Sequence, residues 1–340
     1  MLLKFNTTAA KNKTGRVNNI LAGDIGATKT NLALIKSDGN NITTIHEAHY
    51  KSVDYKNIIE LADIFIKNFP LPDVICFGVA GPVLNGHAKL SNLAWEVDSD
   101  ELSKHFGIKK IKLINDLEAT AYGLALLNDK DIMPLNTGSD VAGNAAIIAP
   151  GTGLGEAGLY YDGNCYHPFA TEGGHSDFAP RNQFDFELYT FLQKKFEHVS
   201  WERLICGPGI VNIYEFLRDE KKRDEPNWLK EKFKNDNLPA VISTHVTECK
   251  ICKETMDWFI QFLAYESANL VLKLKATGGL FIGGGIVPQI ISLFQDNQFY
   301  SSFCNSGRLN YLLEKVPIKI ILNNKTALLG TAYYGSHLIP

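Results

Sequence analysis

Hydrophobic and polar residues alternate in blocks along the first third of the chain. Residues 19–36 hold two apolar runs, ILAGDIG and NLALIK, joined by a Gly/Thr turn, which predicts two short strands. ITTIHEAHY predicts a third strand, and 55–69 has the spacing of a helix that stops at Pro70. VICFGVAG and KIKLIND predict buried strands, with a short helix between them for which Ser99 offers an N-cap, and LEATAYGLALL predicts a following helix. Since strands alternate with helices, we expect a largely parallel sheet covered on both faces.

The polar segment 128–144 breaks this pattern, and a second β region starts at NAAIIAPG and GEAGLYYDG. The pattern over residues 184–275 predicts mainly helix. The chain is then expected to continue with a strand at GGLFIGGG, a helix at 286–294, a strand at VPIKIIL and the final segment TALLGTAYYG. The turn at 23–28 is echoed about 125 residues later by the turn at 150–155, again between apolar strands. This echo predicts two related lobes that face one ligand.

Bulk properties are those of an ordinary globular protein. At 340 residues the chain is long enough for two domains, with 45% apolar and 21% charged residues. A net charge of −3 gives no long-range attraction to nucleic acid or to an anionic membrane, and no apolar run approaches the ~18 residues of a membrane span. We therefore expect neither nucleic acid nor a membrane as a partner. Six scattered cysteines fit a reducing compartment, so we expect a cytoplasmic protein.

The N-terminal segment is basic. It carries Lys4, Lys11, Lys13 and Arg16, has no acid before Asp24, and lacks the apolar core of a secretory signal. We expect a flexible basic extension over residues 1–19, with an organelle transit peptide as the alternative.

Three glycine-rich turns are candidate phosphate sites. Backbone N–H groups approach an anion closely where glycine removes the side chain and tolerates positive φ, and such segments occur at 23–28, 151–153 and 283–285. Each turn alone is equally consistent with a purely structural hairpin. Asp24 would lie beside the phosphates, where a carboxylate is favourable if Mg²⁺ is held through water; the alternative is an Asx-turn.

One motif in this region points elsewhere. Residues 153–158 match the G-x-G-x-x-G pattern of dinucleotide-binding proteins. That pattern requires a helix opening at the glycines, whereas LYYDGNCYHP follows here and is rich in aromatic and turn residues. The dehydrogenase interpretation is therefore rejected.

Asn115 and Asp116 close an apolar strand just before a helix. Open α/β sheets bind ligands at the carboxyl ends of their strands, and a carboxylate there can accept a proton from a hydroxyl that attacks phosphorus. The structural alternative is that Asp116 caps a helix beginning at Leu117. The residues alone leave these two readings open.

Two other segments offer chemistry. In Glu172-Gly173-Gly174-His175 the glycines disfavour a helix, so a carboxylate and an imidazole on a loop could bind a polyol, although a lone His is more often structural. Glu202 on its position alone is an ordinary glutamate at a helix start. Cys249-x-x-Cys252 with His245 has metal-like spacing but lacks a convincing fourth ligand, so we do not expect zinc there.

Several segments together carry a specific resemblance. LAGDIGATKTNLAL, INDLEATAYGL, IAPGTGLGEA, TEGGHSDFAP, HVSWERLICGPGIVNIY, GGLFIGGGIVPQ and ALLGTAYYG resemble motifs of the bacterial glucokinase family from about Ile20 to the C-terminus. The resemblance implies an α/β, two-lobed actin-like/hexokinase-like (ribonuclease H-like) fold, with ATP and glucose in a cleft that closes on the sugar. It also implies a small α/β domain over 20–125 and 323–340, a large α/β domain over 126–322, and a homodimer.

The same resemblance implies roles for individual residues. Asp116 would be the catalytic base for transfer of the ATP γ-phosphoryl group to the 6-hydroxyl of glucose, giving glucose 6-phosphate and ADP, the first step of glycolysis. The residues implied to bind the sugar are Asn115, Asp116, Glu172, His175 and Glu202. Those expected to bind ATP are Gly23, Asp24, Ile25, Gly26, Ala27, Thr28, Gly151, Thr152, Gly153, Gly283 and Gly284, with Mg²⁺ held by Asp24 through water.

The chain departs from the family pattern in its first turn. Ala27 replaces a common glycine, which is tolerable if φ stays negative, and Lys29 replaces a smaller polar residue. The cysteine-rich zinc motif of the neighbouring repressor–kinase group is absent. Alternatives to glucokinase are a kinase of another hexose and a non-catalytic sugar sensor, although the latter needs a DNA-binding module that about 20 N-terminal residues are too few to form.

Overall fold

The computed structural model describes residues 3–5, 17–38, 41–90, 93–139, 141–234 and 236–338. The chain divides into two compact units, the first formed by Met1–Asp131, Leu159–Ala170 and Asn323–Pro340 and the second by Ile132–Gly158 and Thr171–Leu322. Of the predicted basic extension, Lys11, Lys13 and Arg16 lie outside the described residues.

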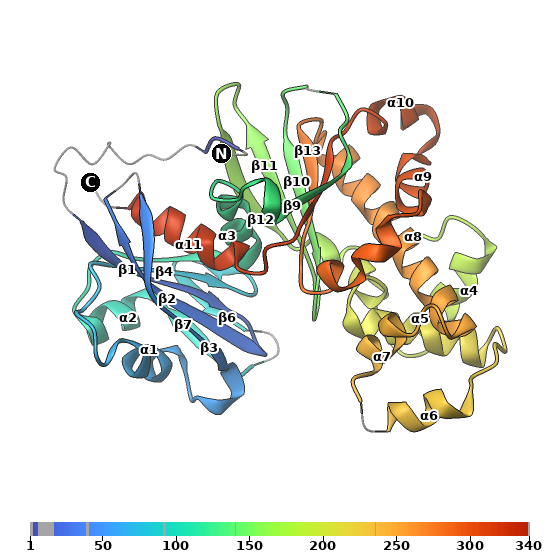
Figure 1. The fold of residues 1–340 in the computed structure, drawn as a ribbon, viewed down its shortest axis with the longest axis horizontal. Helices are drawn as coiled ribbons and strands as arrows, with labels where there is room; N and C mark the ends of the chain where they lie inside the picture. The colour runs from blue at the N-terminus through green and yellow to red at the C-terminus, as the bar shows by residue number, and fades with distance from the viewer. Residues whose placement is uncertain are drawn as a thin grey trace. The chain divides into compact units, whose positions relative to one another are not determined.

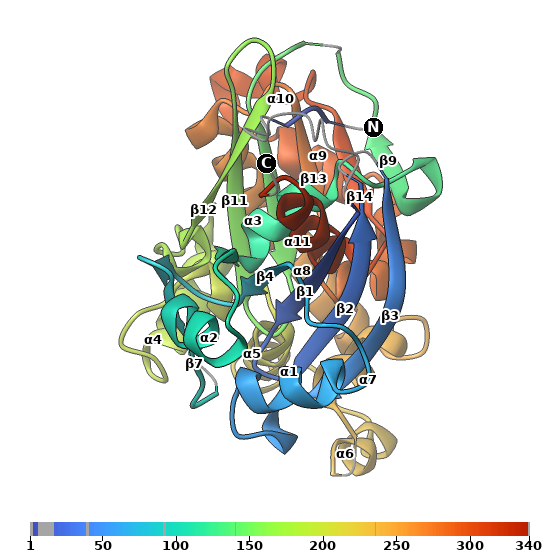
Figure 2. The ribbon, with the colours of Figure 1, turned by 90° about the vertical axis from the view of Figure 1, so that its left-hand side faces the viewer.

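The first unit is built on a five-stranded sheet in the order β3-β2-β1-β4-β8. Its strands are β1 (Asn18–Ile25), β2 (Lys29–Ser37), β3 (Ile42–Lys51), β4 (Val74–Val79) and β8 (Ile111–Asn115). β1 runs parallel to β4 and β4 to β8, whereas the pairs β1-β2 and β2-β3 are antiparallel. Figure 2 shows β1, β2 and β3 side by side. The prediction of a largely parallel sheet is thus wrong for β1–β3. Short turns can join consecutive strands only as antiparallel neighbours.

Alternate side chains of β1 pack on different helices. Leu21 and Ile25 join the core formed with α1 (Ile58–Ile66) and α2 (Ser99–Phe106), whereas Ile20 and Ala22 pack with α11 (Thr326–Ser336). α11 and α3 (Asp116–Gly123) lie on one side of the sheet and α1 and α2 on the other (Figure 1). The sheet is therefore covered on both faces, as predicted.

Short elements complete the first unit. β5 (Val83–Leu84), β6 (His87–Lys89) and β7 (Glu96–Asp98) form a small sheet, and η1 (Ser52–Asp54) and η2 (Asp129–Asp131) are 3₁₀ turns. The predicted N-cap of α2 was wrong by one residue: Asp98 accepts the N–H groups of Asp100 and Glu101, and Ser99 is the first helical residue.

The second sheet repeats the topology of the first. Its order is β12-β11-β10-β13-β14-β9, so its first five strands follow the same sequence of neighbours as β3-β2-β1-β4-β8. The strands are β9 (Ile132–Asn136), β10 (Ala145–Pro150), β11 (Leu154–Tyr161), β12 (Tyr166–Thr171), β13 (Gly279–Ile282) and β14 (Ile318–Ile321). β10, β13 and β14 are parallel, like β1, β4 and β8. The relatedness that the echoed turns predicted is confirmed at the level of strand order.

Helices supply a large part of the second unit. They are α4 (Gln183–Gln193), α5 (Gly207–Asp219), α6 (Asn227–Phe233), α7 (Leu238–Thr244), α8 (Lys250–Leu274), α9 (Gln298–Cys304) and α10 (Asn310–Leu313), with 3₁₀ turns η3 (Gly173–His175), η4 (Trp201–Arg203), η5 (Val287–Phe294) and η6 (Gly307–Leu309). The helix predicted at 286–294 is a 3₁₀ segment kinked at Ile290. Within the described ranges, no helix combines the length and apolar character needed to cross a membrane.

Candidate active site

In the first unit, the candidate residues lie along one edge of the sheet. The register pairs Ile25 with Val79 and Val79 with Asn115, so the carboxyl ends of β1, β4 and β8 are aligned. Neighbouring strands are about 4.8 Å apart, which places the turn after Ile25 roughly 10 Å from Asn115. The first glycine turn and the Asn115–Asp116 pair therefore lie at the same edge, as expected for a ligand site in an α/β sheet.

Asn115, not Asp116, caps α3. The Oδ1 atom of Asn115 accepts the N–H groups of Leu117 (2.9 Å) and Glu118 (3.3 Å), while its Nδ2 donates to the Gly81 carbonyl (3.1 Å). The alternative that Asp116 is the N-cap is therefore wrong. The buried Asn115 amide fixes the strand-to-helix junction, a structural role beyond the predicted one of binding sugar.

Asp116 is the first residue of α3 and is half-buried. Its Oδ1 accepts the N–H of Leu117 at 2.9 Å, and its carbonyl accepts the Thr120 hydroxyl at 2.9 Å. The carboxylate thus lies at a helix N-terminus, where the unpaired N–H groups favour negative charge. A carboxylate at that position has the chemistry to accept a proton.

The first glycine turn connects β1 to β2 through a backbone hydrogen bond from Gly26 N–H to the Lys29 carbonyl (3.0 Å). The Ser52 hydroxyl donates to the Gly26 carbonyl at 2.6 Å and supports the turn from η1. Ala27 is not among the described non-glycine residues with positive φ. The methyl group of Ala27 is therefore tolerated in this turn, as expected for a residue whose φ is not positive. The Thr28 and Lys29 side chains remain exposed.

Asp24 lies at the end of β1, half-buried, and Asn31 Nδ2 donates to its Oδ2 at 3.0 Å. Desolvation raises the pKa of this carboxyl, and the Asn31 hydrogen bond and the charge of Lys29 oppose that shift only in part. A desolvated carboxylate of this kind is stabilised by a nearby cation. Asp24 therefore fits an Mg²⁺ ion held through water.

The second glycine turn, between β10 and β11, is tied to the segments around it. Gly151 N–H donates to the Gly153 carbonyl (2.8 Å), and the Gly151 carbonyl accepts the Gly207 N–H (2.9 Å) at the start of α5. Glu202 Oε2 accepts the Leu154 N–H at 2.9 Å. A Cβ atom at position 153 would clash with that same carboxylate oxygen. A side chain at 153 would therefore displace the Glu202 carboxylate from its place beside the Leu154 N–H, and Glu202 is no ordinary helix-start glutamate.

The third glycine segment packs on the same turn. Gly283 N–H donates to the Ile148 carbonyl (2.9 Å), and Ile286 N–H to the Pro150 carbonyl (3.3 Å). Gly284 has φ +83° and lies so close to the Pro150 carbonyl that no side chain fits. Of the glycines named as phosphate-site candidates, it alone adopts the positive φ that the sequence argument invoked.

The loop Glu172–His175 runs beside the turn that carries Glu202. It forms the 3₁₀ turn η3 rather than an α-helix, with Glu172 and His175 exposed. Trp201 N–H donates to the Ser176 carbonyl (3.1 Å), and Asp177 and Ser200 form a β-bridge. The structure therefore brings Glu172, His175 and Glu202 onto adjacent turns of the second unit.

Glu156, which lies beneath this loop, was not among the predicted site residues. It is 2% exposed, and its carboxylate lies so close to Gly173 that a Cβ atom there would overlap it. Its Oε1 has no hydrogen-bond partner, and burial followed by the charge of Glu266 raises its pKa to about 8. The signal was readable: a glutamate in an inward-facing position of the otherwise apolar strand LGEAGL.

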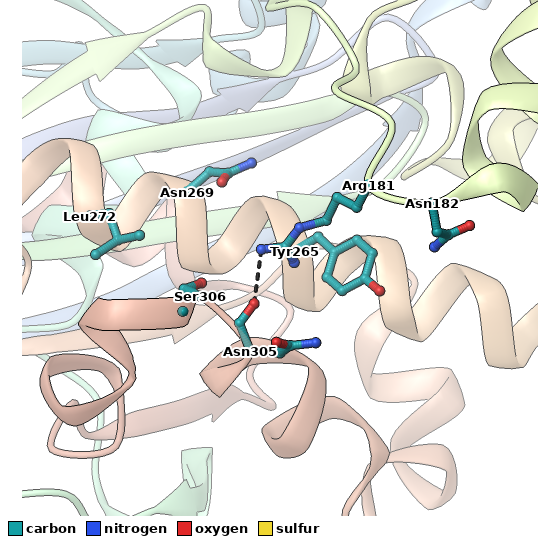
Figure 3. Close-up of a pocket in the computed structure, with 8 residues that line it drawn as sticks. Arg181, Asn182, Tyr265, Asn269, Leu272, Asn305 and Ser306 are labelled. Carbon is teal, nitrogen blue, oxygen red and sulfur yellow. Dashed lines mark hydrogen bonds between the residues drawn. The ribbon is translucent and has the colours of Figure 1, made fainter.

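A pocket of about 540 Å³ lies elsewhere in the second unit. Its lining includes Arg181, Tyr265, Asn269 and Asn305. The Arg181 guanidinium stacks on Tyr265 (4.1 Å) and donates to the Asn305 carbonyl (2.9 Å), as Figure 3 shows. None of the residues predicted to bind sugar or nucleotide lines this pocket.

Matching strand orders, with a glycine turn after the first strand of each, define a protein of the hexokinase-like fold class. The model of the glucokinase family matches residues 21–338. The chain belongs to the glucokinase family and is an enzyme of sugar phosphorylation.

Individual relatives agree with this assignment. The glucokinase of Nostoc punctiforme is 40% identical over 338 residues, covering 94% of this chain and 99% of the relative. The crystal structure of a glucokinase from an Antarctic psychrotroph has a TM-score of 0.78 at 29% identity and covers 93% of this chain and 98% of its own. A repressor–kinase-family (ROK) glucokinase from Streptomyces griseus, crystallised with glucose and AMPPNP, shares the fold with a TM-score of 0.63 at 15% identity, covering 92% and 98%.

Proposed function

We propose that this enzyme transfers the γ-phosphoryl group of ATP to the 6-hydroxyl of D-glucose, giving glucose 6-phosphate and ADP, with Asp116 as the general base. The observation that carries the proposal is the position of Asp116. Its carboxylate follows the carboxyl end of β8, in line with the first glycine turn, while Asn115 takes over the capping of α3. A carboxylate at this strand end can accept the hydroxyl proton as the oxygen attacks phosphorus.

The remaining candidate residues divide between sugar and nucleotide. Asn115, Glu172, His175 and Glu202 would bind the sugar hydroxyls as acceptors and donors. The turns Gly23–Thr28 and Gly151–Gly153, together with Gly283 and Gly284, would present N–H groups to the phosphates. Mg²⁺, held by Asp24 through water, would neutralise charge on the phosphate oxygens.

Support for the substrates comes from the relatives. The Streptomyces griseus structure holds glucose and an ATP analogue in a shared fold, and family membership makes this chain an enzyme rather than a non-catalytic sugar sensor. A kinase of another hexose remains the rival, because the hydroxyl geometry of the substrate is set by the sugar-binding side chains. The cytoplasmic location and the homodimer stay predictions from the cysteine content and the family resemblance.

The decisive experiment is Asp116→Asn, assayed by ADP release with and without glucose. Loss of a general base lowers kcat by roughly 10²–10⁴, while the affinity for glucose changes only a few-fold because the amide preserves size and polarity. Glu118→Gln makes the same kind of carboxyl-to-amide change on the same helix and should leave kcat near the parent value. Near-normal turnover of the Asp116 variant would remove this residue from the mechanism, and a faster reaction with mannose or fructose than with glucose would overturn the substrate.

A further inference from the structure

Three potential metal ligands meet at the hairpin between β11 and β12. The turn Asp162-Gly163-Asn164-Cys165 precedes His167, so the spacing is D-x₂-C-x-H. Asp162 Oδ2 lies 2.7 Å from His167 Nε2 and 3.5 Å from Cys165 Sγ, and Sγ lies 3.8 Å from Nε2. A carboxylate oxygen, a thiol sulfur and an imidazole nitrogen therefore form a compact triangle.

The triangle has the dimensions of a zinc site. A point equidistant from its three corners lies about 2 Å from each, close to the Zn–N and Zn–O distances of about 2.0–2.2 Å and Zn–S of about 2.3 Å. An ion displaced slightly from the plane of the three atoms can reach all of them with only small side-chain movements. No rearrangement of the backbone is needed.

The backbone of the turn orients the carboxylate toward the other two ligands. Asp162 Oδ1 accepts the N–H groups of Asn164 (2.8 Å) and Cys165 (2.9 Å), which leaves Oδ2 for the cluster. The Lys4 ammonium donates to Asn164 Oδ1 (2.8 Å), and Tyr166 N–H donates to the Lys4 carbonyl (2.8 Å). The turn is therefore fixed from both sides. Oriented ligands of this kind are what metal sites obtain from the groups behind them.

Other His and Cys groupings in the chain differ from this one. His105 with Asp63 and His198 with Asp177 form hydrogen-bonded pairs. In the Cys249-x-x-Cys252 segment, His245 Nδ1 faces the Val241 carbonyl at 2.8 Å. Across the described ranges, the Asp162 cluster is the one group of three such residues whose ligand atoms all lie within 4.8 Å of one another.

We propose that Asp162, Cys165 and His167 bind a Zn²⁺ ion, with a water molecule in the fourth position. A thiolate and an imidazole select a borderline-soft ion over Mg²⁺ or Ca²⁺, which prefer all-oxygen sites. Asp162 and His167 are about one-third exposed, at 34% and 38% of their side-chain surfaces, so solvent reaches the open position. The bound ion would fasten the β11–β12 hairpin and, through Asn164, the segment around Lys4.

Metal titration of the purified full-length chain, freed of metal by chelator and kept reduced, tests this proposal. Zn²⁺ should bind at one ion per chain and raise Tm, and Co²⁺ should give thiolate-to-metal charge-transfer absorption in the near ultraviolet. Cys165→Ala and His167→Ala should each weaken binding by at least ~100-fold, more than the 10–100-fold ascribed to residues behind the ligands. The matched controls Cys304→Ala and His198→Gln should bind like the parent.

Each result decides the question. Absence of stoichiometric binding, or a charge-transfer band that persists in Cys165→Ala, overturns the site. Equal losses in the control variants do the same, because they would indicate binding at scattered surface groups. Circular dichroism and Tm of each metal-free variant show whether it folds. If Cys165→Ala does not fold, Asp162→Asn provides a second test, because its side chain keeps an oxygen for the N–H groups of the turn.

Discussion

The two glycine turns occupy the same place in two sheets of the same strand order, yet they are built differently. The first is closed by its own backbone and by Ser52, with Thr28 and Lys29 exposed. The second is joined to Glu202, to the start of α5 and to the segment after β13. The same topology thus provides an open turn beside the half-buried Asp24 carboxylate and a second turn whose geometry depends on Glu202, a candidate sugar-binding residue.

This difference suggests a division of labour. In the first turn, Asp24 is the residue that limits the chemistry, because desolvation raises the pKa of its carboxyl while the neutral Asn31 amide donates a hydrogen bond to its Oδ2. In the second turn the limiting factor is space, because one oxygen of Glu202 lies against both Gly153 and the Leu154 N–H. A change at Glu202 is therefore transmitted to the second turn through a single hydrogen bond.

The largest effect is expected in the first turn. Asp24→Asn removes the charge proposed to hold Mg²⁺ through water, so the Mg²⁺ concentration for half-maximal rate should rise about 10–100-fold, as for other groups behind a metal. Asp54→Asn, an exposed acid of the same unit, is the matched control. Initial rates across a magnesium titration check this, and an unchanged half-saturation value would show that the first turn needs no carboxylate.

In the second turn, neighbouring glycines should respond differently to the same substitution. Gly153→Ala moves the Glu202 carboxylate away from the Leu154 N–H and should cost about 1–3 kcal/mol of stability, the range for a donor left without its partner, together with weaker glucose binding. Gly151→Ala meets nothing closer than 4.0 Å and should be tolerated. Urea unfolding and glucose titration of both variants provide the comparison. Equal losses in the two variants would mean that flexibility of the turn, rather than the Glu202 contact, is what glycine supplies.

The smallest effect concerns pH and Glu156. Its folded pKa of about 8 lies above the ordinary value of 4.5, so its contribution is fully present below about pH 4.5 and is lost as pH rises toward 8, where the folded state must carry a buried charge. Glu156→Gln should flatten the decline in stability between pH 5 and 8 and add about 1–2 kcal/mol near pH 8. Urea unfolding at several pH values measures the slope. An unchanged slope, or the same flattening in the exposed control Glu248→Gln, would contradict the assignment.

Local pattern was sufficient for most elements of the sheets. Apolar runs predicted β1, β2, β4 and β10, and the recurrence of a glycine turn predicted the repeated topology. Cap residues were less secure, because Asp98 and Ser99, like Asn115 and Asp116, are adjacent residues that can each cap a helix. Only the backbone conformation decides between such neighbours.

Contacts between distant segments were beyond the sequence. The Glu202–Leu154 hydrogen bond joins residues 48 apart, and nothing near Glu202 indicates its partner. Glu156 and the Asp162 cluster are different, because each carried a readable local signal: a charge in an apolar strand and a D-x₂-C-x-H spacing. The Cys249-x-x-Cys252 spacing, for which zinc was not expected, drew attention away from the hairpin.

The first unit begins the chain but also needs its end. Ile20 and Ala22 of β1 pack against Leu328 and Ala332 of α11, which the ribosome supplies about 300 residues later. During translation this face of the nascent sheet stays uncovered and prone to aggregation, while every residue of the second unit emerges before α11 does. The first unit is therefore completed only when α11 has been synthesised. A premature stop codon shortly before Thr326 would destabilise the first unit, which contains the N-terminal strands, more than the second unit, which precedes the stop.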